Sequence, residues 1–274
     1  MIFWTIVHVA LKSLAANKMR SMLAMLGIII AVWSVISALA LGAGAQATVL
    51  DNLSSLGTNL LVVRPGQRGT GGVMSGTQQN LVVADAEALL ELDGVTHVAP
   101  VVRGNAQVKY YSDNASTTVL GTTATYFAIR NIEVVDGRPL YDGDCDATAR
   151  VCVIGPDTAE ALFGEDFASF CVGETIAVKG VSYRVVGLTA AKGDQGFANP
   201  DDQIIIPYTT AMKQVMGVDH LSEIDLRAES QEKLGAIQSD ATQILRQRHR
   251  LRDVDDNDFS VQNQAEMIST MTTA

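Results

Sequence analysis

The sequence lacks the short motifs that carry most nucleotide, hydrolytic and metal chemistry. It has no G-x-x-x-x-G-K-[ST] loop for the phosphates of ATP, no H-E-x-x-H zinc helix, no G-x-S-x-G nucleophile turn and no C-x-x-C pair. The four histidines stand far apart along the chain. We therefore predict no catalytic, cofactor-binding or metal-binding residue and no cofactor, and we expect that the chain is not an enzyme.

Two acidic runs resemble metal loops only in part. Residues 142–146 (DGDCD) alternate as a calcium loop begins, but the sixth position is Ala147 instead of glycine and the twelfth is Val153 instead of glutamate. Residues 253–258 (DVDDND) also lack the glycine. Both runs are therefore predicted to be solvated turns.

Charge is missing from the first part of the chain. No acidic residue occurs among the first 50 positions, and residues 21–50 contain no charged side chain at all. The almost wholly apolar stretch 22–43 would rise about 33 Å as a helix, which matches a hydrocarbon core of about 30 Å. Because Lys12, Lys18 and Arg20 precede it, we expect a membrane helix with a cytoplasmic N-terminus and the main domain on the other side of the membrane.

A cleaved signal peptide is the alternative interpretation of the same stretch. Small residues at 38–40 and 45–47 resemble cleavage sites. The apolar core of a signal is usually about 7–15 residues long, whereas about 20 apolar residues occur here after a 20-residue segment. The length favours an uncleaved membrane helix.

The residues around this stretch predict two further features. Residues 1–20 have helical spacing of apolar side chains and a polar side with Lys12 and Lys18, which is typical of an amphipathic helix lying on the cytoplasmic membrane surface. After residue 43 no proline intervenes, so the membrane helix is predicted to continue to residue 56 as a stalk outside the membrane and to end at Gly57.

The part of the chain after the apolar stretch is acidic. It holds 17 of the 20 basic residues and all 30 acidic residues, which gives a formal charge of about −13. This charge argues against nucleic acid as a partner. The cysteines, Cys145, Cys152 and Cys171, allow a 145–152 disulfide, a 152–171 disulfide or no disulfide, and the sequence leaves these alternatives open.

The pattern of apolar runs predicts an α+β fold. Strands at 59–64 and 95–102 flank a helix at 84–92, and strands at 223–227 and 259–262 flank a helix at 230–250. Two such β-α-β units can join into one ferredoxin-like sheet. Residues 57–105 and 219–264 are assigned to this subdomain, and 106–218 to an inserted, strand-rich subdomain.

Other segments complete the predicted organisation. In the insertion, strands are expected at 107–111, 117–122, 150–154, 175–179, 181–188 and 204–206, and short helices at 155–163 and 207–215. Residues 66–77 and 190–202 are glycine-rich and polar, so they are predicted to be loops. Residues 66–76 and 190–202 are either contact sites or merely flexible linkers, and the sequence leaves both alternatives open. Residues 265–274 are expected to begin a second, truncated transmembrane helix.

Eight stretches of the sequence resemble the permease subunits of MacB-type ABC transporters, within the FtsX-like permeases. They lie at 17–46 (NKMRSMLAMLGIIIAVWSVISALALGAGAQ), 53–66 (LSSLGTNLLVVRPG), 94–102 (GVTHVAPVV), 119–140, 186–193, 204–217, 245–250 and 256–266. The resemblance covers the whole chain, although none of these stretches is a catalytic signature.

The resemblance implies a transport function without chemistry in this chain. In that family the first membrane helix leads into a periplasmic domain with a ferredoxin-like part and an inserted part, and three more membrane helices follow. The partners that it implies are a cytoplasmic ABC ATPase on a separate chain, a second permease (as a homodimer or pair), the lipid membrane, and a periplasmic adaptor with an outer-membrane channel. ATP hydrolysis would drive export of macrolides, peptides or lipoproteins by mechanotransmission.

A different class of function remains as an alternative. One membrane span followed by an outer domain is also typical of a single-span binding or sensor module that works without an ATPase. The end of the sequence at Ala274 leads us to expect a truncated permease in the first case.

Overall fold

The structure is a computed structural model, and it describes residues 4–6, 8–9, 18–56, 59–70, 73–77, 79–166, 170–193 and 199–263. The chain divides into two compact units, Met1–Asn52 and Leu53–Ala274. Three predicted features lie outside the described residues: most of the amphipathic helix at 1–20, the helix end at Gly57, and the second membrane helix at 265–274.

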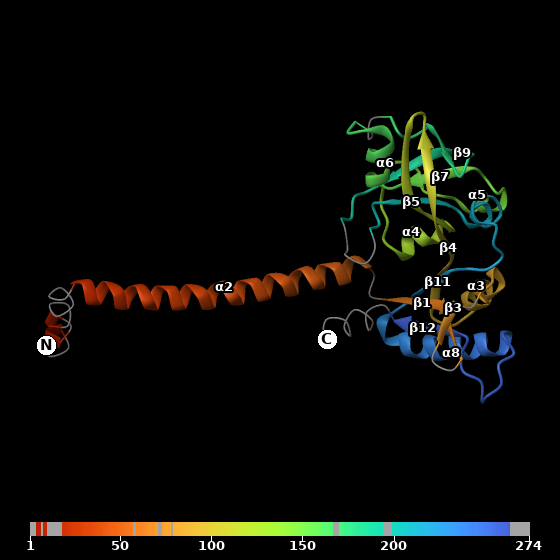
Figure 1. Cartoon of the computed structure of the whole chain (residues 1–274). Helices are drawn as coiled ribbons and strands as arrows, with labels where there is room; N and C mark the ends of the chain where they lie inside the picture. Colours follow the sequence, from red (N-terminus) through yellow and green to blue (C-terminus); the bar gives the residue numbers. More distant parts are fainter. Residues whose placement is uncertain are drawn as a thin grey trace. The chain divides into compact units, whose positions relative to one another are not determined.

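The apolar stretch forms one long helix, α2 (Lys18–Leu56), drawn without a break in Figure 1. Its 39 residues rise about 58 Å. The segment Lys18–Gly44 is long and apolar enough to cross a membrane, with a mean hydropathy of 2.5, and none of its most apolar window is buried within the chain. Large apolar side chains such as Leu26, Trp33 and Leu39 are exposed, as lipid contact would require.

The second unit contains a ferredoxin-like sheet. Its strands are β1 (Leu60–Pro65), β4 (Val95–Tyr110), β11 (Glu223–Ala228) and β12 (Phe259–Asn263), in the order β12-β1-β11-β4 with every neighbouring pair antiparallel. The helices α3 (Val83–Leu90) and α8 (Leu234–Arg248) connect the strands of the two β-α-β units. Figure 1 shows both helices beside these strands.

One face of this sheet is covered by the two helices. Leu61 and Val63 of β1 and Ile224 and Leu226 of β11 are buried with the apolar stripe of α8. The helical spacing of Leu234, Ile237, Ala241, Ile244 and Leu245 predicts an apolar stripe. Of these five residues the structure buries Leu234, Ile237, Ala241 and Leu245, while Ile244 is only half-buried.

The remaining strands extend the sheet beyond β4. They are β5 (Asp113–Thr122), β6 (Val134–Gly137), β7 (Val151–Ile154), β8 (Thr175–Val178), β9 (Val181–Thr189) and β10 (Gln203–Pro207), and the path continues β4-β5-β10-β7-β9-β6, with β8 against β4 and β9. The short helices are α4 (Thr125–Ile129), α5 (Asp142–Asp146), α6 (Pro156–Phe163), α7 (Tyr208–Thr210), the π-helix η2 (Ala211–Met216) and the 3-10 turn η3 (Gln231–Lys233). The fold is α+β, as predicted.

The structure corrects the sequence-based elements at several places. The strands expected at 95–102 and 107–111 are one 16-residue strand, β4, and the hairpin that follows turns at Tyr111 and Ser112 because Tyr110 pairs with Asp113. The loop expected at 66–77 contains the hairpin strands β2 (Gln67–Thr70) and β3 (Val73–Thr77). Residues 134–143, which the sequence patterns predict to be a turn region, hold β6 and the start of α5.

Besides the core under α3 and α8 and the core within the insertion, a third core joins the ferredoxin-like sheet to the rest of the unit. It contains Leu60 and Val62 of β1 and Ala99 and Val101 of β4, which face away from α3 and α8. Packed with them are Tyr126, Phe127 and Ile129 of α4 and residues of the second half of the sheet, Leu120, Val153 and Ile205. Both faces of the ferredoxin-like sheet are therefore covered.

We predict that Gly121→Ala destabilises the domain. A Cβ at Gly121 would overlap the Cβ of Ala211, which is fully buried, and would lie 3.2 Å from the Cα of Tyr208. Overpacking of this kind costs about 1–3 kcal/mol. Thermal unfolding of the purified chain should show a lower midpoint.

The matched control is Gly235→Ala on the exposed side of α8, where a Cβ meets nothing within 4 Å. Alanine is the better helix former, so this variant should unfold at the same temperature or higher. An unchanged midpoint for Gly121→Ala would contradict the close packing of β5 against Ala211.

Candidate functional site

The most unusual polar feature of the domain is a cluster of charges at the third core. This junction cluster consists of Arg64, Arg103, Arg130, Glu223 and Asp225. Glu223 and Asp225 alternate with Ile224 and Leu226 along β11, so their side chains point to the face opposite α3 and α8. That face is covered, so the carboxylates are buried instead of solvated.

Arg130 holds Asp225 in a two-pronged pair. Its Nε donates to Oδ2 at 2.6 Å and its Nη2 to Oδ1 at 3.0 Å, and the Asp225 side chain is fully buried. Burial raises the pKa of Asp225 to about 6, and the opposing attraction of Arg130 limits this shift. The pKa of Arg130 is raised, because Asp225, Tyr126 and Glu223 together outweigh the effect of its own burial.

Glu223 is held by two further arginines. It accepts from Arg64 Nε at 3.1 Å and from Arg103 Nη2 at 3.2 Å, and Arg130 Nη2 lies 3.9 Å away. Burial acts to raise the pKa of Glu223, but the three guanidinium groups outweigh it and the pKa is lowered. Both carboxylates are engaged by cations, so this arrangement can fix the position of α4 on β11 but offers no free acid or base for catalysis.

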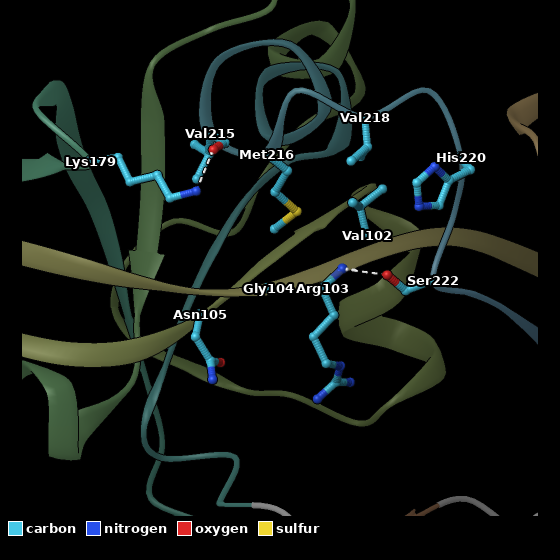
Figure 2. Close-up of a pocket in the computed structure, with 10 residues that line it drawn as sticks. All are labelled: Val102, Arg103, Gly104, Asn105, Lys179, Val215, Met216, Val218, His220 and Ser222. Carbon is cyan, nitrogen blue, oxygen red and sulfur yellow. Dashed lines mark hydrogen bonds between the residues drawn. The ribbon is translucent and has the colours of Figure 1, made fainter. Parts of the chain in front are cut away.

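A cavity of about 220 Å³, the junction pocket, lies beside the same part of β4. Figure 2 shows its ten lining residues: Val102, Arg103, Gly104, Asn105, Lys179, Val215, Met216, Val218, His220 and Ser222. In this view Met216 points from the π-helix η2 toward the strand, between Lys179 and His220, while Arg103 and Asn105 point the other way.

Two hydrogen bonds stabilise the walls of the junction pocket. Lys179 Nζ donates to the carbonyl oxygen of Val215 at 2.9 Å, and the backbone N–H of Arg103 donates to Ser222 Oγ at 2.9 Å. The lining combines apolar side chains, Val102, Val215, Met216 and Val218, with polar and basic ones, so it can make both kinds of contact with a ligand.

The two loops predicted as contact sites have different outcomes. Residues 66–77 form the β2–β3 hairpin, apart from 71–72, which are not described. In the 190–202 segment, Asp201 accepts from the backbone N–H groups of Lys192 and Gly193, and Lys192 Nζ donates to the carbonyl oxygen of Arg130 at 2.8 Å. The first residues of this loop are therefore held at Arg130, which directly follows α4. Residues 194–198 lie outside the described residues.

The acidic runs are used in ion pairs. In α5, Asp144 accepts from Arg138 at 2.7 Å, and this hydrogen bond lowers the pKa of Asp144. In the 253–258 run, Asp255 pairs with Arg252 and Asp258 contacts His249 Nδ1 at 2.8 Å. Within the described residues no group of three or more His, Cys, Asp or Glu side chains is arranged to hold a metal ion.

The chain is similar to proteins of one family. Residues 21–244 match the model of the MacB-like periplasmic core domain. The chain belongs to this family.

Relatives named macrolide export ATP-binding/permease protein MacB include those of Bdellovibrio bacteriovorus, 34% identical over 95% of this chain, and of Azoarcus, 36% identical over 96%. The chain spans only about 40% of the length of these relatives.

Solved structures with the same fold agree with this family. The periplasmic region of MacB from Actinobacillus actinomycetemcomitans matches with a TM-score of 0.68 at 21% identity, over 83% of this chain and 99% of that one. The extracellular domain of the noncanonic ABC-type transporter YknZ from Gram-positive bacteria matches with a TM-score of 0.61 at 19% identity, over 75% of this chain and all of that one. The region that matches the family model, residues 21–244, includes most of the helix that is long and apolar enough to span a membrane.

The sequence did not predict either feature of the site. Alternating acids at Glu223 and Asp225 indicated a strand, but alternation alone does not reveal that both faces of a sheet are covered. Arg130 directly follows the short apolar run 126–129. A basic residue beside such a run was the available sequence signal for a partner of the buried acids. The junction pocket depends on contacts between residues more than 100 positions apart, such as Arg103 with Ser222.

We predict that Arg130→Met destabilises the domain by about 3–5 kcal/mol, because it leaves the buried Asp225 carboxylate without its partner. The double variant Arg130→Met/Asp225→Leu should regain most of this loss, since it removes both buried charges. Urea unfolding of the purified chain measures both effects.

The control is Arg252→Gln, which removes an exposed pair with Asp255 and should leave the midpoint unchanged. If the single and double variants at Arg130 and Asp225 lose the same stability, the pair is not the cause.

All three cysteines are free and buried in the structure, without either of the disulfides left open by the sequence. Burial raises the pKa of the Cys145 thiol to about 11 and also raises that of Cys152 and Cys171. Thiolate is the reactive form, so these groups should react slowly.

We therefore predict that iodoacetamide at pH 8 modifies none of the three thiols in the folded protein within the time that modifies an exposed Val254→Cys variant. In denaturant without reductant, mass spectrometry should find three modified cysteines. Fewer than three would indicate a disulfide.

Proposed function

We propose that this chain is the permease part of a MacB-type transporter that couples ATP hydrolysis in the cytoplasm to export from the periplasm. The observation that supports this most directly is α2. It continues as one helix from the apolar span Lys18–Gly44 to Leu56, four residues before β1 begins. A helix without a break can transmit a displacement along its axis, because each backbone hydrogen bond links one turn to the next.

The proposal also assigns an orientation in the membrane and a division into subdomains. The N-terminus, with Lys12, Lys18 and Arg20, lies in the cytoplasm, and the acidic domain lies in the periplasm. Residues 21–56 act as membrane helix and stalk. Residues 57–105 and 219–264 form the ferredoxin-like subdomain, and 106–218 form the insertion. The amphipathic helix at 1–20 and a second membrane helix beginning at 265–274 complete the arrangement.

The partners are those that such a transporter needs. An ATPase outside these 274 residues supplies the energy, since the chain has no Walker A loop. The names of the relatives, macrolide export ATP-binding/permease proteins, support this partner. A second permease, a periplasmic adaptor and an outer-membrane channel complete the assembly, and the substrates are macrolides, peptides or lipoproteins. The chain itself is not the enzyme.

We predict that Val49→Pro uncouples the transporter that contains this chain. Proline removes one backbone donor inside α2 and breaks the helix at a cost of about 3 kcal/mol or more. Export of a macrolide such as erythromycin from intact cells should fall to the level of a strain without the transporter, while ATP hydrolysis in isolated membranes continues.

The matched control is Val49→Ala, which keeps the helix and should export normally. Normal export by Val49→Pro, at equal amounts in the membrane, would refute transmission through α2. If neither protein exports and no ATPase copurifies with the chain, the alternative of a single-span binding module is favoured instead.

A further inference from the structure

The hydrogen-bonded edge of β4 is interrupted beside the junction pocket. One edge of β4 pairs with β5 over nine consecutive positions, from Val102 to Tyr110. On its other edge, β11 pairs with β4 up to Val101, and β8 begins to pair only at Val108. Among the described residues no strand pairs with the intervening segment on that edge.

The directions of the backbone groups in this segment follow from the pairing. Tyr110 and Asp113 flank a two-residue turn, so they form a hydrogen-bonded pair, and the even-numbered residues of β4 point their N–H and C=O groups at β5. The odd-numbered residues therefore point at the other edge. Two backbone bonds agree with this assignment. The backbone N–H of Ser222 donates to the carbonyl oxygen of Val101, and the backbone N–H of Lys179 donates to that of Gln107.

Between these two bonds, backbone groups are available to a strand. The backbone N–H of Arg103 donates to Ser222 Oγ and is therefore occupied. Four other backbone groups lie on the open edge: the C=O of Arg103, the N–H and C=O of Asn105, and the N–H of Gln107. The side chains of Arg103, Asn105 and Gln107 are exposed. The gap from Arg103 to Gln107 is about 13 Å long, which is room for about three or four residues of an extended chain.

The walls of the gap match such an occupant. Val102, Met216 and Val218 supply apolar surface, and Met216 lies against Gly104, where a Cβ would be 3.3 Å from its Cε. Met216 belongs to a π-helix, a geometry that is frequent at functional sites. Methionine adapts to different apolar partners, which suits a site that binds more than one sequence.

The charge of the lining is opposite to that of the domain. None of the ten lining residues is acidic, although the domain carries about 13 excess negative charges. Arg103 is paired with Glu223 and His220 lies 3.5 Å from Asp219, so among the described residues Lys179 is the lining cation without a carboxylate partner. Lys179 Nζ has one bond to Val215 O, so two of its three donors remain for a ligand. This end of the gap suits a carboxylate.

We propose that the junction pocket binds an extended segment of a partner polypeptide, which adds as a short strand to Arg103–Gln107 and places a carboxylate, at a chain end or an acidic side chain, beside Lys179. Main-chain bonds then supply affinity, and the apolar wall and Lys179 supply selectivity. This proposal does not depend on ATP coupling, because it concerns only the folded domain.

Hydrogen–deuterium exchange of the full chain in detergent can test the proposal. The probe is a pool of pentapeptides of randomised Val, Ile, Thr and Phe with a free C-terminal carboxylate, at 1 mM. We expect the amides of Asn105 and Gln107 to exchange at least fivefold more slowly with the pool, because they become hydrogen-bonded. The same pool with C-terminal amides should need about tenfold higher concentration, and a backbone N-methylated pool should have no effect.

Two variants separate Lys179 from general charge. Lys179→Gln keeps a donor for Val215 O but loses the charge, so it should raise the required concentration of the free-acid pool about tenfold. Lys213→Gln removes an exposed lysine of the π-helix η2, which carries Met216, and should change nothing. Equal unfolding temperatures for the two variants show that both are folded.

Three results would overturn the proposal. They are no slowing of exchange at Asn105 and Gln107 with any pool, slowing confined to other segments, and equal binding of the N-methylated pool, which would exclude strand addition. Equal responses of Lys179→Gln and the unaltered chain would refute the carboxylate position.

Discussion

The arrangement of the domain depends on β4 being one strand in two halves of a sheet. From Val95 to Val101 it is the edge partner of β11 in the ferredoxin-like sheet, and from Val102 to Tyr110 it pairs with β5, which leads into the insertion. Strand pairing resists rotation because any turn of one half against the other would break several backbone bonds at once. The ferredoxin-like part and the insertion are therefore held in a fixed relation at this strand.

The packing on either side of β4 strengthens this constraint in two different ways. The third core joins Val62 and Val101 to Phe127 by burial of apolar surface, which is favourable but tolerates small shifts. The Arg130–Asp225 pair adds little net stability, since desolvation offsets much of the attraction, but it is directional. Two hydrogen bonds in one plane allow only one orientation of α4 on β11, so the pair selects a single packing from those that the apolar contacts would allow.

The sequence predicted the parts of this fold that depend on local pattern. The β-α-β units were readable because Leu234, Ile237, Ala241 and Leu245 recur at helical spacing and because apolar runs such as 59–64 have strand length. The continuity of β4 was missed because Gly104 and Asn105 are poor strand formers, and it is pairing with β5 that extends them. The buried charges at Glu223 and Asp225 were missed for a related reason, since only tertiary structure covers the second face of β11. The lining of the junction pocket likewise comes from three separate stretches of the chain: β4, the turn between β8 and β9, and residues 215–222.

The open edge at Arg103–Gln107 follows from the same sharing of β4. A strand that leaves one sheet partner at Val101 and gains another at Val108 must pass through a segment where neither reaches it, because β11 and β8 belong to parts of the fold that diverge there. An unpaired edge invites association with other chains, and proteins usually block it with charge or a covering element. Here the block is partial: Ser222 takes one donor and Met216 covers Gly104, while the backbone groups of Asn105 stay open and none of the ten residues lining the pocket is acidic. The domain has an excess of acidic residues, yet none of them lines this pocket. We therefore interpret the half-covered edge beside Lys179 as a binding surface and not as an unavoidable consequence of the fold.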